Sequence, residues 1–171
     1  MGVSPDFMAD PRVKAYAAAV AVFGLDRLTK WFIERHVSFV DTYRVIPGFF
    51  DIIHSENRGV AFGLFNESTF EWRNTLLVTA ALTAVVAVSI LLWKAERLDR
   101  LSLCGFALVL GGAAGNVFDR MVWGRVTDFL LFYIGEYQWP AFNVADSAIV
   151  VGSLLLVIHL FRPERRTAHV S

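Results

Sequence analysis

Two aspartates lie in apolar surroundings, where a charged group is costly. Asp128 lies between Val126 and Phe129, and Asp146 opens an apolar run that continues to about residue 161. Ionisable groups in or beside a membrane-spanning segment are expensive, and each is by default a candidate functional residue. We expect neither carboxyl group to be neutralised by a cation close to it in the sequence. Asp128 and Asp146 are therefore the candidate catalytic pair.

Two carboxyl groups held close together can carry out hydrolysis. They cannot both ionise cheaply, so they share one proton. The ionised group takes a proton from water, which attacks a peptide carbonyl, and the protonated group donates a hydrogen bond to the carbonyl oxygen. Asp146 follows Asn143, a predicted helix N-cap, and the first turn of a helix stabilises negative charge. We predict that Asp146 is the ionised base and that Asp128, in a predicted apolar loop, is the proton donor.

Further polar residues gather at the predicted ends of the helices. Asp26 and Lys30 are four residues apart on one helix face, and their opposite charges predict an ion pair. We likewise expect Asp119 and Arg120 to neutralise one another, on the same helix face as Asn116. If these helix ends lie on one side of a membrane, the polar groups converge near one depth.

Other chemistries fit the sequence less well. The four histidines are scattered without an HExxH or comparable spacing, so a zinc hydrolase is not indicated. A serine–lysine hydrolase needs a deprotonated lysine, and Asp26 keeps Lys30 charged. The strongest alternative is a proton- or ion-conducting membrane protein, because acidic residues in spans also serve as relays. A relay would place charges across the bilayer, whereas these gather at one end. A purely structural membrane protein leaves the polar cluster unexplained.

The composition favours a membrane protein. Hydrophobic residues make up 56% of the 171 residues, against about 45–50% in soluble domains. A membrane-spanning helix needs about 20 mostly apolar residues. We predict a single membrane domain over residues 1–171, with spans at about 14–33, 75–93, 101–118 and 145–161. The formal net charge of zero gives no indication of nucleic-acid binding, and the single cysteine, Cys104, is expected to be a packing residue.

Basic residues predict the orientation, because short loops that carry Lys and Arg stay in the cytoplasm. Three basic clusters fall on one side of a four-span protein: Arg12 and Lys14; Lys94, Arg97 and Arg100; and Arg162, Arg165 and Arg166. Both termini are therefore expected in the cytoplasm, with segments of about 36–72 and 119–143 outside. The first of these segments predicts short strands around a turn at Pro47 and Gly48. The expected fold is an all-α membrane protein with four transmembrane helices and a small extracytoplasmic β-rich cradle.

Five sequence blocks resemble, in order, the signature blocks of bacterial lipoprotein signal peptidases, also called signal peptidase II. They are LDRLTK (25–30), NRGVAFG (57–63), GGAAGNVFDR (111–120), GRVTDF (124–129) and PAFNVADS (140–147). The resemblance implies an inner-membrane aspartyl endopeptidase with no metal or other cofactor and an active site near the outer face. It implies that the substrates are prolipoproteins with a diacylglyceryl-modified cysteine, cut just before that cysteine. Membrane lipids are the other expected partners, and neither nucleic acid nor an obligate protein partner is implied.

The resemblance also implies which residues form the site. Asp128 and Asp146 match the catalytic aspartates of the family, in agreement with the pair chosen from their surroundings. The other matching polar positions, which hold the pair or contact substrate, are Asp26, Lys30, Asn57, Asn116, Asp119, Arg120 and Asn143.

Compartment reporters test the predicted orientation. Fusions at Ser171 and within the loop at about 94–100 should report the cytoplasm, because short basic loops are retained there. A fusion near Phe49 should report the outside. An external carboxyl terminus would overturn both the orientation and the predicted placement of the aspartates.

Overall fold

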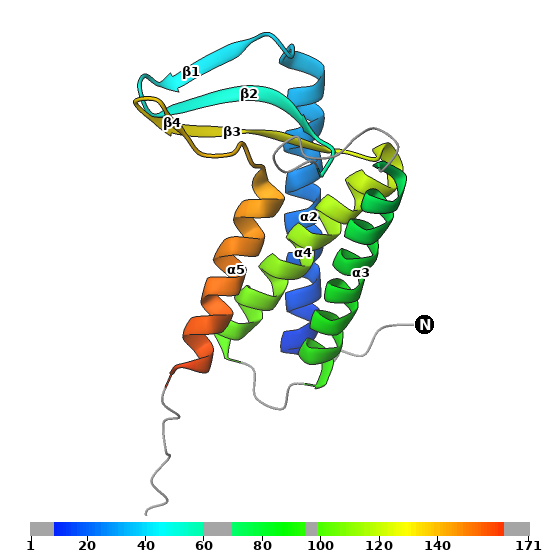
Figure 1. Ribbon diagram of the computed structural model, residues 1–171. Helices are drawn as coiled ribbons and strands as arrows, with labels where there is room; N and C mark the ends of the chain where they lie inside the picture. Colours follow the sequence, from blue (N-terminus) through cyan, green and yellow to red (C-terminus); the bar gives the residue numbers. More distant parts are fainter. Residues whose placement is uncertain (1–8, 60–69, 95–98, 163–171) are drawn as a thin grey trace, which may run out of the picture.

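The computed structural model of the protein describes residues 9–59, 70–94 and 99–162. Within these ranges, four long helices run side by side and a small antiparallel sheet lies across one end of them (Figure 1). The sequence predicted both features. Residues 60–63 of the second signature block, and the basic residues Arg97, Arg165 and Arg166, lie outside the described residues.

The four helices correspond to the four predicted spans. They are α2 (Pro11–His36), α3 (Phe70–Lys94), α4 (Arg100–Trp123) and α5 (Val144–Leu160). Helices α2 and α4 run toward the sheet, and α3 and α5 run away from it (Figure 1). Of the described helices, α3 and α4 are long and apolar enough to cross a membrane, and α5 is apolar but shorter. Helix α2 has the length, but charged residues interrupt its apolar sequence.

Helix α4 extends beyond its predicted end. The predicted membrane span stopped at residue 118, and α4 continues to Trp123. The helix includes Asp119 and Arg120, as expected from their predicted place on the helix that carries Asn116. It ends at Gly124, whose φ of +66° is the left-handed conformation that glycine adopts without a Cβ clash. The backbone N–H of Gly124 donates to the Arg120 carbonyl at 3.1 Å. The chain then turns directly into a strand.

The predicted β-rich cradle is a four-stranded antiparallel sheet in the order β1-β2-β3-β4. Its strands are β1 (Thr42–Ile46), β2 (Phe50–Asn57), β3 (Val126–Ile134) and β4 (Tyr137–Gln138). Strands β1 and β2 meet at the predicted turn, where Gly48 has a φ of +80°. Asp128 lies in β3, opposite Ser55 of β2, so its predicted loop setting was wrong. The pairing of β3 with a strand from a distant part of the chain decides this conformation.

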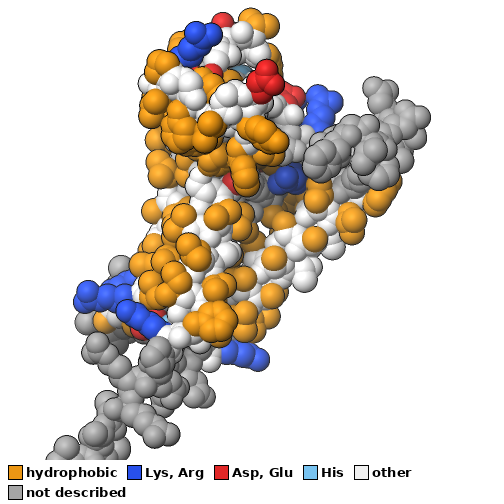
Figure 2. Space-filling model, turned by 60° about the vertical axis from the view of Figure 1, so that its left-hand side comes forward, with side chains coloured by type: hydrophobic (Ala, Val, Ile, Leu, Met, Phe, Trp, Pro, Cys, Tyr) orange, Lys and Arg blue, Asp and Glu red, His pale blue; other side chains and the backbone are white. Residues whose placement is uncertain are grey.

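Apolar clusters hold the helices together and fix the sheet above them. One cluster joins α2, α3 and α4 around Ala15, Ala19, Leu92, Ala107 and Leu110. A second joins the end of α2 to the sheet and the start of α5, around Ile33, Val37 and Phe129. Apolar side chains also cover much of the outer sides of the helices (Figure 2). Extended apolar surface of this kind is typical of contact with a membrane or another protein.

The GGAAG run of α4 is a close helix-packing surface, as predicted. A Cβ on Gly111 would meet the Ala19 carbonyl oxygen of α2 at 2.5 Å. A Cβ on Gly112 would overlap the Ala145 carbonyl oxygen of α5. Small residues at such crossings allow helix backbones to approach closely. Because the two glycines face different helices, α4 is in close contact with both α2 and α5.

We predict that Gly112→Ala lowers the free energy of unfolding by about 1–3 kcal/mol, because the backbone of α5 must move to make room. Gly24→Ala is the matched control, since a Cβ at Gly24 of α2 meets nothing within 4 Å and alanine favours the helix. Reversible unfolding in mixed detergent micelles measures both variants. Equal stability of Gly112→Ala and the wild type would contradict the close contact between α4 and α5.

Candidate active site

Asn143 links the two predicted catalytic aspartates. Its Nδ2 donates to Asp128 Oδ1 at 2.7 Å, and its backbone N–H donates to Asp146 Oδ2 at 3.3 Å. Asp128 comes from β3 and Asp146 from the first turn of α5. One residue therefore contacts both carboxyl groups, and the pair expected from the sequence lies in one place.

The same contacts begin helix α5. The first N–H groups of a helix lack partners within the helix, so a capping side chain stabilises them. Asn143 Oδ1 accepts from the Asp146 N–H at 2.9 Å while Asp146 accepts from the Asn143 N–H, which is a capping box. The predicted N-cap is confirmed. The geometry of the site near Asn143 is thus fixed by the local start of the helix.

Asp128 is buried and hydrogen-bonded through both carboxyl oxygens. It is only 3% exposed, and Asn57 Nδ2 of β2 donates to its Oδ2 at 3.0 Å. Asn57 Oδ1 accepts from the Gly59 N–H at 2.8 Å, which orients the amide so that its Nδ2 faces Asp128. The resemblance placed Asn57 in the site, and the structure brings it into contact with a predicted catalytic residue.

Burial raises the pKa of Asp128 to about 6. The hydrogen bond from Asn57 lowers this pKa, the charge of Asp146 raises it, and the hydrogen bond from Asn143 lowers it. The cost of desolvating the charged form outweighs the two hydrogen bonds. Asp128 can therefore hold a proton at a higher pH than an ordinary aspartate, as the predicted proton donor requires.

Asp146 is held from the side of α4. Asn116 Nδ2 donates to Asp146 Oδ1 at 2.7 Å, and Asn116 Oδ1 accepts from Lys30 Nζ at 3.1 Å. Because its oxygen faces an ammonium group, the amide must present its N–H to the carboxylate. Arg120 lies near enough to interact electrostatically with Asp146 and Asp128. Asp146 therefore has an amide partner from α4 in addition to its bond with the Asn143 backbone.

A buried cluster of charged residues from α2 and α4 contacts Asn116 through Lys30. Lys30 Nζ lies 2.8 Å from Asp26 Oδ2, and both side chains are fully buried. It also lies 2.7 Å from Asp119 Oδ2, in ion-pair contact without the angle of a hydrogen bond. Asp26 Oδ1 accepts from the Ala145 N–H at 2.9 Å and so connects the cluster to α5. The predicted pair of Asp26 and Lys30 is confirmed.

The predicted pair of Asp119 and Arg120 is wrong. Asp119 pairs with Lys30 and Arg27 of α2, and Arg120 donates to the Asn116 carbonyl at 3.2 Å. Consecutive residues of a helix do not face each other, so Asp119 points toward α2 while Arg120 points elsewhere. Arg27 was not among the predicted site residues, and its guanidinium lies 4.5 Å from the centre of the Trp123 ring. No pattern in the sequence predicts that contact between two helices.

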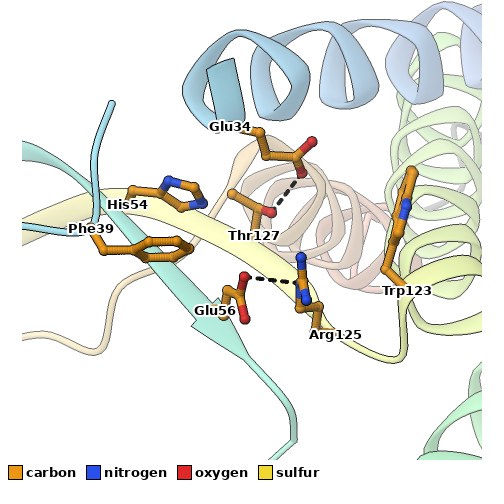
Figure 3. A pocket seen from close by; sticks show the side chains of 7 residues that line it. All are labelled: Glu34, Phe39, His54, Glu56, Trp123, Arg125 and Thr127. Carbon is orange, nitrogen blue, oxygen red and sulfur yellow. Dashed lines mark hydrogen bonds and ion pairs between the residues drawn. The ribbon is translucent and has the colours of Figure 1, made fainter. Parts of the chain in front are cut away.

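Asp128 has no ion pair with the cation nearest to it in the sequence. Arg125, three residues earlier, lies 3.0 Å from Glu56 through its Nε. Successive side chains of a strand point to opposite faces, so Thr127 and Asp128 face different sides of β3. Figure 3 shows Thr127 beside Glu34 of α2 in a pocket of about 220 Å³. Neither catalytic candidate lines this pocket, so it is separate from the aspartate site.

Within the described ranges, no group of three or more His, Cys, Asp or Glu residues is arranged to hold a metal ion. The polar groups at the site are carboxyl, amide, ammonium and guanidinium groups. Such a set can bind, donate and accept protons at a carbonyl group and a water molecule.

Comparisons with known proteins agree with the motifs. The family model described as signal peptidase (SPase) II matches residues 18–162. The chain is 62% identical over 164 residues to the lipoprotein signal peptidase of Solibacter usitatus (strain Ellin6076), covering 96% of this chain and 100% of that relative. It is 43% identical over 150 residues to the lipoprotein signal peptidase of Nitratidesulfovibrio vulgaris (strain DP4), covering 86% and 90%.

The fold is also similar to that of a solved structure described as a bacterial membrane enzyme determined by the in meso method at 1.9 Å resolution. The TM-score is 0.76 at 29% sequence identity, over 87% of this chain and 93% of that one. Because the family model covers most of the chain and a relative is 62% identical over nearly all of it, this protein belongs to the signal peptidase II family, the lipoprotein signal peptidases.

Proposed function

We propose that this protein is an aspartyl endopeptidase of a bacterial membrane that removes signal peptides from prolipoproteins, with Asp128 and Asp146 as its catalytic residues. Family membership supports the reaction and the membrane location. The contact of Asn143 with both carboxyl groups carries the assignment of residues. The buried Asp128 and the half-buried Asp146 share this partner, and two neighbouring carboxyl groups are what an aspartyl mechanism needs.

The surroundings of the two aspartates give them different roles. Asp146 lies at the N-terminal end of α5 and accepts hydrogen bonds from two N–H groups, which stabilises its charge. As the base, it takes a proton from water while the water oxygen attacks the scissile carbonyl carbon. Asp128, whose pKa is raised to about 6 by burial, donates its proton toward the carbonyl oxygen as charge develops there. The tetrahedral intermediate then collapses as its C–N bond breaks. Asp146 gives the proton that it took from water to the leaving amine, and the proton on the former carbonyl oxygen returns to Asp128 as the carbonyl group forms again.

In the proposed topology, all four helices cross the bacterial inner membrane and both termini are cytoplasmic. The start of α2, the end of α3, the start of α4 and the end of α5 lie at the end opposite the sheet (Figure 1). Lys14, Lys94, Arg100 and Arg162 lie at or beside these helix ends, some of them visible at the lower end in Figure 2, and basic residues beside short loops support a cytoplasmic position. The aspartates lie at the other end, beneath the sheet and near the outer face.

The proposed substrates are prolipoproteins whose cysteine already carries diacylglycerol. A lipid anchor keeps the scissile bond at the membrane surface, at the depth of the aspartates. Burial of acyl chains contributes about 0.8 kcal/mol per methylene, so the anchor can position the peptide with little demand for side-chain specificity.

A proton- or ion-conducting protein is not favoured. The acidic residues of the site lie around one end of the helices, and Asp26 and Asp119 are neutralised by cations. A relay across the bilayer needs groups at several depths. The buried charges instead form a closed cluster that orients an amide toward Asp146.

We predict that Asp128→Asn lowers kcat for cleavage of a diacylglyceryl peptide by about 10²- to 10⁴-fold, because asparagine cannot supply the acidic proton. The asparagine is nearly isosteric, so the variant should fold and bind substrate. Asp51→Asn, at another buried aspartate, is the matched control and should cleave normally. A chelator should not change either rate.

Two outcomes would contradict this assignment. Near-normal turnover of Asp128→Asn would remove that residue from the mechanism. Proton flux in reconstituted vesicles that Asp128→Asn abolishes, without peptide cleavage by the wild type, would favour the conducting alternative.

The pH dependence of kcat/KM tests which aspartate is the donor. A donor works only while protonated, so kcat/KM should fall as pH rises through the pKa of Asp128, near 6. Asn57→Ala removes a hydrogen bond that lowers this pKa, so the alkaline limb should move up by about one pH unit. The apparent pKa of the alkaline limb belongs to the coupled pair of aspartates. The decisive measurement is therefore the change in this pKa between the wild type and Asn57→Ala. A limb that stays in place, or moves to lower pH, contradicts the donor role of Asp128.

A further inference from the structure

We propose that a pocket at the end of the helices opposite the sheet binds an anionic phospholipid. The pocket has a volume of about 420 Å³ and lies between the first turns of α2 and α4. Arg100 and Asn116 are 16 residues apart in α4, a separation of about 24 Å along the helix axis. This lipid site is therefore distinct from the aspartate site.

The charge of the pocket determines the class of ligand. Its described lining includes the cations Lys14 and Arg100, and none of the lining residues in the described ranges is acidic. Among the residues that the structure describes, neither cationic side chain has a hydrogen-bond or ion-pair partner. Two unpaired cations beside one pocket attract an anionic group, and a guanidinium can bind a phosphate through two parallel hydrogen bonds.

The acidic residues nearby are already engaged by other groups. Asp10 caps α2 by accepting from the Arg12 N–H at 2.8 Å. Asp99 caps α4 by accepting from the Ser102 N–H at 2.8 Å, and its Oδ2 lies 3.7 Å from Arg162 Nη1. These contacts leave neither of the two acidic residues free to pair with Lys14 or Arg100.

The remaining lining is apolar and suits an acyl chain. Ala15, Ala18, Leu103 and Ala107 line the same pocket and supply alkyl surface. Cationic pockets between membrane helices on the cytoplasmic side bind anionic lipid headgroups. A phosphodiester with an attached acyl chain fits both parts of the pocket, whereas free phosphate would use only the cations. The inference rests on the proposed placement of the helices in the membrane, and it does not depend on the roles of the aspartates.

Native mass spectrometry of detergent-purified protein tests the lipid site directly, with phosphatidylglycerol and phosphatidylcholine added in equal amounts. The wild type should retain phosphatidylglycerol at least about five-fold better, since a cation near the surface contributes about that factor. Lys14→Gln and Arg100→Gln should each reduce the preference, and the double variant should lose it. Lys94→Gln is the matched control, because it removes a charge at the same end outside the pocket lining.

Cys104 provides a second measurement in the unmodified chain. It is the only cysteine of the protein, it is exposed, and it lines the lipid site. Phosphatidylglycerol should slow its reaction with a maleimide several-fold more than phosphatidylcholine does, and the double variant should show no difference between the lipids. Equal retention and equal protection by both lipids, or a preference that survives in the double variant, would overturn the proposal.

Peptide cleavage measured on the same samples separates the two claims. If the wild type prefers phosphatidylglycerol but does not cleave the peptide, and the double variant loses the preference, the lipid site is supported and the proposed peptidase activity is not. If the wild type cleaves the peptide but shows no lipid preference, the peptidase activity is supported and the lipid site is not.

Discussion

The ammonium group of Lys30 is fully buried, and the arrangement of α2, α4 and the aspartate site depends on how its charge is compensated. A buried charge that loses its partner costs about 3–5 kcal/mol. Asp26 on the same helix supplies one partner and Asp119 of α4 supplies the other. Helices α2 and α4 must therefore approach closely at this depth. Gly115 allows this approach, because a Cβ there would overlap the Asp26 carboxyl group.

Neutral amides stand between this charge cluster and the aspartates. Asn116 accepts from Lys30 and donates to Asp146. Asn143 and Asn57 donate to Asp128. A cation in direct contact would lower the pKa of a carboxyl group by about 1–3 units. An amide orients the carboxyl group without adding a charge next to it. Burial can then keep the pKa of Asp128 raised, which an aspartyl mechanism requires of one member of the pair.

The sheet holds Asp128 over the helix ends, on the side of the site away from the charge cluster of α2 and α4. Thr127, the residue before it, donates through its hydroxyl to Glu34 Oε1 at 2.7 Å. Asp26, Lys30 and Glu34 follow one another at intervals of four residues, on one face of α2. The same face of this helix thus contacts α4 at one depth and strand β3 at another. Rigid elements on both sides fix the aspartates more closely than a loop would.

The sequence alone determined the four helices, the turn at Pro47 and Gly48, the cap at Asn143 and the pair of Asp26 and Lys30. These features depend on hydrophobicity over one segment or on residues within four positions of each other, so local spacing contains the information. The polar residues of the site could also be chosen from sequence, because charged and amide groups are costly beside apolar spans.

Only the tertiary structure decided which of these residues meet. Asp119 pairs with Lys30 and Arg27 across two helices, Asp128 lies in a strand, and Asn143 contacts both aspartates. Each of these contacts joins segments that are distant in the sequence or depends on where such segments pack. Which residues meet depends on the close approach of helices at glycines and on the need to pair buried charges. Neither can be predicted from residues that are close together in the sequence.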